Sequence, residues 1–226
     1  MNYQIDAPGS AIRTTVKLPA SKSISNRALI LNALSYSAYD VENLSDCDDT
    51  NLMVKALNSN DRDFNVGAAG TTMRFLTAFL SKVVGEWTIT GTERMKNRPI
   101  KVLVDALNAL GARIEYMEKE GYPPLRIFGS ALQGGEISLP GNVSSQYISA
   151  ILMIAPLTEN GVTLHLEGAI ISRPYIHITL QLMEQYGVRA SWTENMIKVL
   201  PQEYKPIHFT VESDWSAASY WYEIMA

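Results

Sequence analysis

Apolar and polar positions alternate along the chain in two patterns, one typical of helices and one of short strands. In residues 98–110 the apolar side chains recur at i, i+3, i+4, i+7 and i+10 and share one helical face: Ile100, Leu103, Val104, Leu107 and Leu110. Residues 125–128 and 136–139 are short apolar runs closed by Gly or Pro, which predicts strands. The pattern predicts an α/β chain built of strand–helix units.

A repeated unit can be followed twice along the chain. A β-like run ending in Gly leads through polar residues to a Pro-led helix, a second Gly and another β-like run. The first copy comprises residues 87–91, 98–111 and 112–116, and the second comprises residues 162–168, 173–187 and 188–190. Pro99 and Pro174 are expected in the first helical turn, where the missing N–H costs nothing. Gly111 and Gly187 follow the helices, where a left-handed cap is needed.

Two helical segments, one of them the helix of the second copy, are apolar on more than one side. They cover residues 145–154 and 173–186, and we expect both to lie inside the domain. This arrangement predicts helices packed inside small sheets. Residues 215–225 predict a final helix after Ser213 and Asp214, and its aromatic side chains are expected to belong to a core: Trp215, Tyr220, Trp221 and Tyr222.

The composition is that of a folded protein. Of 226 residues, 46% are hydrophobic and 19% are charged. The net charge of −4 argues against a general affinity for nucleic acid or anionic membranes, which needs clustered positive charge. The longest apolar run, residues 150–157, is too short to cross a bilayer, and the N-terminus does not resemble a signal peptide. With Cys47 as the single cysteine, we expect a cytoplasmic protein.

Five segments place polar or cationic residues at the predicted start of a helix: 21–27, 67–74, 94–99, 144–147 and 172–175. Any one of them alone is best explained as ordinary helix capping. Helix N-termini attract anions, however, and four cationic side chains add full charges at three of these starts: Lys22, Arg27, Arg74 and Arg98. If the units pack side by side in parallel, these ends converge. The coincidence predicts a small ligand with several phosphate or carboxylate groups.

Other candidates for chemistry are weaker. His165, His177 and His208 have no metal-ligand spacing, and His165 is interpreted as a satisfied, partly buried side chain. Residues 46–50 predict a turn and N-cap before a helix at residues 51–57, in preference to a metal loop. No base accompanies Cys47, and residues 67–71 match neither a Walker loop nor a dinucleotide fingerprint.

The same segments resemble, in order, the signatures of the 5-enolpyruvylshikimate-3-phosphate synthase (3-phosphoshikimate 1-carboxyvinyltransferase) family. The matching segments are residues 18–27, 67–74, 94–100, 144–147, 172–176 and 212–218. The family's proteins are roughly twice this long, so the chain resembles their N-terminal half. At the chain's end no Gly, Asn or basic residue closes the last helix, which is compatible with a natural end or with a cut before a second part.

The resemblance implies a fold of two similar lobes, each made of three βαβαββ units with inner helices. Residues 20–210 would form the N-terminal, substrate-binding lobe. Residues 1–19 and 211–226 would be the first pieces of a second lobe that is otherwise absent.

The implied reaction transfers the enolpyruvyl group of phosphoenolpyruvate to the 5-hydroxyl of shikimate 3-phosphate and releases phosphate. It is the sixth step of the shikimate pathway and proceeds by addition and elimination. The resemblance implies no metal or organic cofactor, no nucleic-acid or membrane partner, and a monomeric full-length enzyme that is a target of glyphosate.

The resemblance also implies roles for individual residues. Lys22 would contact both substrates and act in catalysis, by assisting proton transfer or stabilising the intermediate. The shikimate 3-phosphate ligands would be Lys22, Ser23, Arg27, Ser144, Ser145, Gln146, Ser172 and Tyr175. The phosphoenolpyruvate ligands would be Lys22, Gly70, Arg98 and Gln146, and a guanidinium fork such as that of Arg98 matches a carboxylate or phosphate.

Two departures from the family pattern matter. Ala68 stands where the second signature usually has Asn, so a side-chain contact from that position is lost. The family's catalytic Asp and Glu belong to the half that is absent, so we expect little or no turnover from this chain alone.

Two alternatives remain open at this point. A related transferase acts on UDP-N-acetylglucosamine, but it has Asn where this chain has Ser23, and its loop cysteine does not match Cys47. A non-catalytic lobe that binds phosphorylated metabolites would keep the anion sites without the second lobe.

Overall fold

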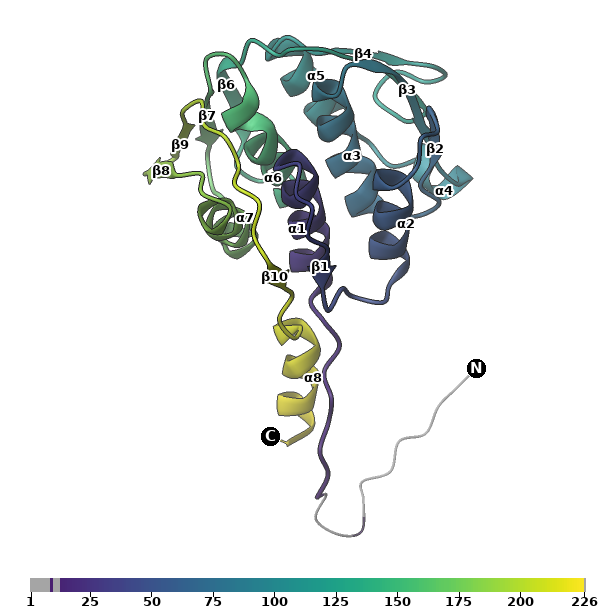
Figure 1. Ribbon diagram of the computed structural model, residues 1–226, viewed down its shortest axis with the longest axis vertical. Coiled ribbons are helices and arrows are strands. Elements are labelled where there is room, and N and C mark those ends of the chain that lie inside the picture. The colour runs from purple at the N-terminus through teal and green to yellow at the C-terminus, as the bar shows by residue number, and fades with distance from the viewer. Residues whose placement is uncertain (1–8, 10–12, 226) are drawn as a thin grey trace.

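The computed structural model describes residues 9 and 13–225. Two four-stranded sheets dominate the described chain (Figure 1). In spatial order, the first consists of β2 (Asp63–Asn65), β3 (Gly85–Thr90), β5 (Leu125–Gly129) and β4 (Arg113–Tyr116). The second consists of β6 (Gly135–Pro140), β7 (Val162–Glu167), β9 (Met196–Val199) and β8 (Ala190–Thr193). In each sheet the first two strands are parallel and the other pairs are antiparallel.

Helices connect the strands of both sheets in the same order. In the first unit, α3 (Gly70–Lys82) follows β2, and the short α4 (Glu93–Lys96) and then α5 (Lys101–Ala109) follow β3. In the second unit, α6 (Ser145–Ile154) and the turn η1 (Ala155–Leu157) follow β6, and α7 (Arg173–Gln185) follows β7. Both units therefore have the βαβαββ order, and the predicted α/β class is confirmed.

A third unit is assembled from the two ends of the lobe. It contains α1 (Lys22–Leu34), β1 (Val41–Glu42), α2 (Asp48–Leu57) and β10 (Phe209–Thr210). Val41 pairs with Phe209 in a parallel two-stranded sheet, so segments far apart in the sequence close this unit. Its sheet has two strands in the described chain, against four in each of the other units.

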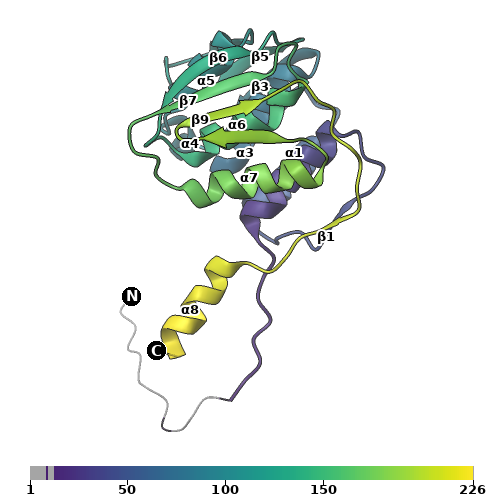
Figure 2. The ribbon, with the colours of Figure 1, turned by 90° about the vertical axis from the view of Figure 1, so that its left-hand side faces the viewer.

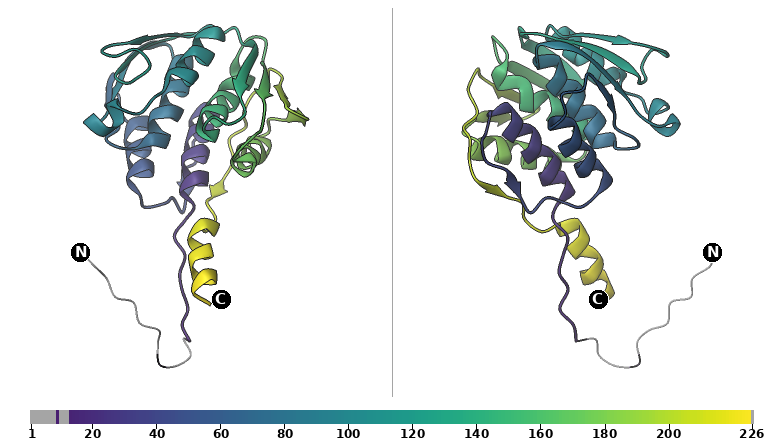
Figure 3. Two further views of the ribbon diagram at one scale, coloured as in Figure 1. Left: turned by 180° about the vertical axis from the view of Figure 1, so that it is seen from behind. Right: turned by 45° about the vertical axis from the view of Figure 1, so that its right-hand side comes forward.

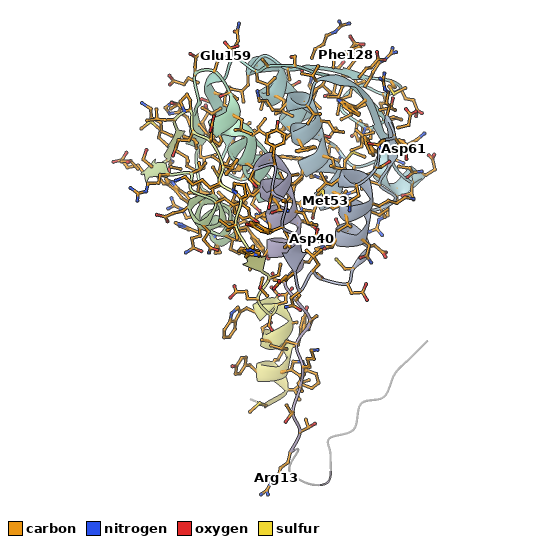
Figure 4. The ribbon with its side chains drawn as sticks, in the orientation of Figure 1. Arg13, Asp40, Met53, Asp61, Phe128 and Glu159 are labelled. Carbon is orange, nitrogen blue, oxygen red and sulfur yellow. The ribbon has the colours of Figure 1, made fainter. Side chains whose placement is uncertain are left out.

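Three helices, α1, α3 and α6, lie inside and the two four-stranded sheets lie outside, as the sequence pattern predicts. Figure 2 shows β6, β7 and β9 spread over α6, with α3 and α1 behind it. In α6 every residue from Tyr147 to Ile154 is buried, and almost all of α3 is buried as well. Figure 4 shows side chains filling the interior around the fully buried Met53, whereas Asp61 and Glu159 lie at the rim.

The prediction that residues 173–186 lie inside the domain is wrong for most of α7. Its buried residues are Ile176, Thr179, Leu182 and Met183, and most of its remaining residues are exposed. This helix packs on one side against α6 and α1. Its other side faces outward in the described chain, so its further apolar side chains are at most partly buried.

Several element boundaries differ from the sequence prediction, and three of the differences are the following. Pro99 precedes α5, which starts at Lys101 with Ile100 as its N-cap, whereas Pro174 lies in the first turn of α7 as predicted. The predicted strand at residues 188–190 is displaced to Ala190–Thr193, and the predicted helix at residues 51–57 already begins at Asp48. Gly111 and Gly187 follow their helices with positive φ, as predicted.

The chain enters and leaves the lobe through two adjacent segments. Ser21 N donates to Glu212 O at 2.9 Å, and Asp214 N donates to Pro19 O at 2.8 Å. Beyond this crossing, α8 (Trp215–Met225) and the segment before α1 both extend away from the three units (Figures 1 and 3). Residues 1–8, 10–12 and 226, part of the segments assigned to a second lobe, lie outside the described residues.

The prediction that the aromatic residues of α8 belong to a core is wrong for the described chain. Trp215 is 70% exposed, and Tyr220, Trp221 and Tyr222 are exposed too, while Ala218 is the buried residue of the helix. The reason is that α8 extends away from the three units in the described part of the chain (Figure 1), which leaves these side chains exposed. As for membranes, no helix in the described part of the chain is long and apolar enough to span a bilayer.

Candidate functional site

The first predicted segment forms the start of α1. Ser21 is the N-cap, and its side chain accepts a hydrogen bond from Ile24 N at 3.5 Å. Lys22 is the first helical residue, and its side chain is 45% exposed. Its Nζ lies 3.5 Å from Asp49 Oδ2. The charged end of Lys22 therefore lies at the positive end of a helix and remains accessible to a ligand.

Asp49, in the first turn of α2, joins this end of α1 to the start of α3. Its Oδ1 accepts a hydrogen bond from Thr71 N at 2.9 Å, and its backbone carbonyl accepts one from Thr72 Oγ1 at 2.6 Å. The N-cap of α3, Ala69, offers no capping side chain. Asp49 thus supplies from another helix the capping acceptor that the local sequence lacks.

Gly70 opens α3 and is covered by two guanidinium groups. A Cβ at this position would collide with Arg98 Nη1 and would lie 2.8 Å from Arg74 Nη1. Arg74 Nη1 also donates to Gly70 O at 2.7 Å. Only a glycine leaves room for Arg98 to lie this close to the helix start. The structure therefore brings together Gly70 and Arg98, two of the four residues assigned to phosphoenolpyruvate by resemblance.

Arg74 adds a second positive charge beside Arg98. Its side chain is nearly enclosed, and burial, with a smaller contribution from the charge of Arg98, lowers the pKa of its guanidinium. Its Nε is buried and has no hydrogen-bond partner among the described residues. The ring of Tyr147 lies 5.6 Å from its guanidinium carbon, and the Tyr147 hydroxyl donates to Pro99 O at 2.7 Å. Tyr147 thereby anchors the backbone next to Arg98.

The fourth predicted segment, residues 144–147, forms the start of α6 and contacts the start of α3. Ser144 is its N-cap and accepts a hydrogen bond from Gln146 N at 3.3 Å. Gln146 Nε2 donates to Thr71 Oγ1 at 3.0 Å, which connects this helix to the start of α3. Ser145 is half-buried beside Gln146, and Ser144 is exposed.

Arg27, one turn into α1, is buried and not at the surface. Its side chain joins three helices: Nε donates to Thr179 Oγ1 at 2.7 Å, Nη2 donates to Ser149 Oγ at 2.9 Å, and Nη1 donates to Ser23 O at 2.8 Å. Burial lowers its pKa from 12.5 to about 10, which leaves the group protonated at neutral pH. Through these contacts α1 and α7 are held beside α6.

Ser172 lies at the start of α7 in a left-handed conformation, with φ 59° and ψ 31°. Its side chain makes no capping hydrogen bond, and it is exposed. Residues other than glycine rarely adopt this conformation, and such positions cluster at functional sites. Tyr175, also exposed, follows in the first turn, where its N–H donates to Ser172 O at 3.1 Å.

The predicted site residues therefore fall into two connected groups. One group, at the starts of α1, α3 and α6, is linked through Asp49 and Thr71: Lys22, Gly70, Arg98, Ser144, Ser145 and Gln146. The other group, at the starts of α1 and α7, is linked through Arg27 and Thr179: Ser23, Arg27, Ser172 and Tyr175.

Sequence reasoning did not assign Asp49 to the site. It placed residues 46–50 in a turn and N-cap, and Cys47 is indeed the N-cap of α2. Two acidic residues in a first helical turn are an ordinary capping signal. The contacts of Asp49 with Lys22 and Thr71 depend on packing, so no local signal could have found them.

The weaker candidates lie elsewhere in the structure. His165 contacts Glu136 across two strands, consistent with a satisfied side chain. The ring of His177 stacks on Trp192 at 4.6 Å, and the ring of His208 lies 3.7 Å from that of Tyr39.

Several known proteins are similar to this chain in sequence. The family model described as EPSP synthase (3-phosphoshikimate 1-carboxyvinyltransferase) matches residues 7–61 and 58–226. A 3-phosphoshikimate 1-carboxyvinyltransferase of Bacteroides fragilis is 61% identical over 227 residues, which cover 100% of this chain and 55% of the relative. One from Vibrio cholerae is 43% identical over 242 residues, covering 94% of this chain and 57% of the relative.

A solved structure supports the fold. EPSP synthase from Acinetobacter baumannii superposes with a TM-score of 0.80 at 21% identity, over 91% of this chain and 51% of that one. The chain spans about half the length of the curated relatives that it matches. Since the family model covers nearly all of the chain and the motif residues gather at the helix starts, the chain belongs to the EPSP synthase (3-phosphoshikimate 1-carboxyvinyltransferase) family.

Proposed function

We propose that this chain forms the substrate-binding lobe of an enzyme that transfers the enolpyruvyl group of phosphoenolpyruvate to the 5-hydroxyl of shikimate 3-phosphate. Residues 20–210 constitute this lobe, and the segments on either side lead to a second one. The observation that carries the proposal is the chain of contacts that brings Lys22, Arg98 and Gln146 to the start of α3. The relatives' shared name supports the reaction.

The start of α3 fits phosphoenolpyruvate, which carries a carboxylate and a phosphate. Backbone N–H groups at a helix start attract anions, and the guanidinium of Arg98 lies directly over Gly70. A guanidinium fork can donate two parallel hydrogen bonds to either anionic group. The ammonium of Lys22, a compact charge on a flexible side chain of α1, is connected to the start of α3 through Asp49.

Shikimate 3-phosphate is assigned to the hydroxyl-rich starts of α6 and α7. Ser144, Ser172 and Tyr175 are exposed, and the Ser172 hydroxyl is not used for capping. Ser145 and Ser23 are half-buried beside them. Hydroxyl donors together with a cation suit a phosphate or carboxylate ligand, because hydrogen bonds to an ionised acceptor are stronger than neutral ones.

The chemistry needs proton transfer and charge stabilisation. In the addition step, a proton joins C3 of phosphoenolpyruvate, and the 5-hydroxyl oxygen attacks C2 and loses its proton. In the elimination step, C3 loses a proton while the bond from C2 to the phosphate oxygen breaks, which releases inorganic phosphate. Lys22 stabilises or protonates the intermediate, and Arg98 holds its anionic groups. We expect little or no turnover from these 226 residues alone, because the resemblance places the acid–base carboxylates outside them.

Titration calorimetry on this chain tests the proposal. We expect shikimate 3-phosphate to bind, and Ser144→Ala to weaken that binding. Arg126→Ala, which removes an exposed guanidinium paired with Glu86 on the outer sheet, is the matched control and should not change it. Preference for UDP-N-acetylglucosamine, or equal affinity for shikimate without its phosphate, would overturn the proposal. A phosphate-release assay with both substrates should detect little turnover.

A further inference from the structure

Arg27 is a buried cation whose partners are all neutral. The side chain is 2% exposed, and its three donor nitrogens bond to two hydroxyls and one backbone carbonyl. Among the described residues, no carboxylate lies within salt-bridge distance of it. Buried charges in proteins are normally paired with an opposite charge. The full positive charge of this group is therefore held inside the lobe without an anionic side chain among the described residues.

The two hydroxyls that hold Arg27 form a directed chain. Ser149 Oγ and Thr179 Oγ1 lie 2.8 Å apart, and Thr179 Oγ1 also donates to Tyr175 O at 3.0 Å. A hydroxyl has one proton to donate. Because Thr179 donates its hydrogen bond to the carbonyl of Tyr175, its oxygen must accept the hydrogen bond from Ser149. This order leaves lone pairs on both oxygens aimed at the guanidinium of Arg27.

Neutral acceptors and a carboxylate would orient a guanidinium equally well. They differ in how strongly the oriented guanidinium can still attract another anion. A carboxylate at contact distance would cancel most of the attraction that the cation exerts on another anion. Two hydroxyls fix the plane of the group and leave its charge uncompensated. In a buried environment of low dielectric constant, that charge acts strongly on a ligand anion at the half-buried edge near Ser23.

We propose that Ser149 and Thr179 are positioning residues that aim Arg27 at an anionic group of the ligand while leaving its charge free. The inference rests on the proposed function, because it takes shikimate 3-phosphate as the ligand. Neither residue touches the ligand. Thr179 also ties the direction of Arg27 to the backbone of Tyr175, so the first turn of α7, with Ser172 and Tyr175, is set together with Arg27.

The test uses hydroxyl deletions in this chain. Thr179→Val and Ser149→Ala each remove one acceptor and keep nearly the same shape. Thr179→Ser restores the hydroxyl. Thr77→Val is the matched control, because Thr77 is also fully buried in a helix, but its hydroxyl bonds to Met73 O within α3. The measurements are the dissociation constant for shikimate 3-phosphate and the NMR resonance of Arg27 Nε–H, identified by its absence in Arg27→Lys.

We expect Thr179→Val and Ser149→Ala each to weaken binding about tenfold or more, as expected for the loss of a hydrogen bond to a charged group. Thr179→Val should also shift the Nε–H resonance and speed its exchange with water. Thr179→Ser should recover both properties, and Thr77→Val should change neither. A double-mutant cycle between Ser149→Ala and Thr179→Val should show coupling, since both act through Arg27.

The outcomes separate the two proposals. If the unaltered chain fails to bind shikimate 3-phosphate, the proposed function is wrong, and positioning is then judged on the Nε–H resonance alone. If the unaltered chain binds and Thr179→Val binds equally well, the positioning proposal is wrong. Equal weakening by Thr77→Val would also overturn it, because the effect would then be general loosening of the lobe. If Thr179→Val does not fold, Ser149→Ala decides by the same criteria.

Discussion

Asp49 and Thr71, which belong to different helices, are joined by a hydrogen bond of 2.9 Å from the backbone N–H of Thr71 to the Asp49 carboxylate. The second carboxylate oxygen lies 3.5 Å from Lys22 Nζ. One side chain therefore caps α3 and holds the cation of α1 in place. This contact keeps two helix starts together where the proposed phosphoenolpyruvate site lies.

We expect Asp49→Ala to lower the free energy of unfolding by about 1–2 kcal/mol, because α3 loses the side-chain acceptor that Asp49 supplies and the negative charge at its start. Asp48→Ala is the control, since Asp48 is the exposed neighbour in the same turn of α2. Urea denaturation of both variants measures the difference. Equal losses for the two variants would show that Asp49 acts only within its own helix.

Gly70→Ala should weaken phosphoenolpyruvate binding by about tenfold or more, equivalent to roughly 1.4 kcal/mol. The added methyl group would collide with the guanidinium of Arg98 and force it away from the helix start. Alanine is otherwise the better helix former, so the free energy of unfolding should change little. Calorimetry and urea denaturation together check this expectation. Unchanged affinity would mean that Arg98 does not need to lie over Gly70.

Two buried tyrosines should respond in opposite ways to loss of the hydroxyl. Tyr204 donates to Met153 O at 2.7 Å, so Tyr204→Phe leaves a buried carbonyl unpaired and should cost about 1 kcal/mol of stability. The Tyr186 hydroxyl is buried without a partner in the described chain, so Tyr186→Phe should be neutral or stabilising. Denaturation at pH 7 compares the two variants. A large loss in Tyr186→Phe would reveal a partner for its hydroxyl.

The same tyrosine predicts a pH dependence at alkaline pH. Burial raises the pKa of Tyr186 from 10.0 to about 12. The unfolded chain therefore releases this proton at lower pH than the folded chain does. The stabilising contribution is complete below about pH 10 and is lost as the pH rises through about 12. Tyr186→Phe should show a smaller loss of stability between pH 10 and 12 than the unaltered chain, and an identical loss would contradict this assignment.

The exposed aromatic face of α8 can be checked by fluorescence. Trp215 is 70% exposed, whereas Trp87 and Trp192 are only partly exposed. Trp215→Phe should therefore reduce the red-shifted emission that acrylamide quenches readily, and the remainder should come from Trp221, which is 44% exposed. If the emission lost in this variant is blue-shifted and protected, α8 is covered in solution, by the lobe or by another molecule.

Local sequence patterns predicted helices and strands well where neighbouring residues, such as a capping serine, set the bounds of the element. The helix at residues 145–154 was predicted with the bounds that the structure has, because its apolar run lies between a serine cap and a proline turn. The prediction failed for α7, whose apolar residues on several sides suggested an interior helix. Apolar residues reveal which faces can be buried, but the number of neighbouring elements decides which faces are buried.

The residues of the candidate site also divide into those that the local sequence predicts and those that depend on tertiary packing. Motif residues at helix starts, such as Lys22 and Gln146, were found from the sequence because capping and anion binding use the same local features. Whether these residues bind the proposed substrates stays a prediction. Asp49 was missed, and the burial of Arg27 was not foreseen, because their partners lie on other helices.

The sequence by itself determined the α/β class, the two repeated units and the set of polar helix starts, since these follow from spacing over a few residues. Only the tertiary structure decided that Asp49 caps α3, that Arg98 lies over Gly70, and that Arg27 is held by two hydroxyls. Such contacts join residues that are far apart in the sequence. Their formation depends on how whole helices pack, and no local pattern encodes that packing.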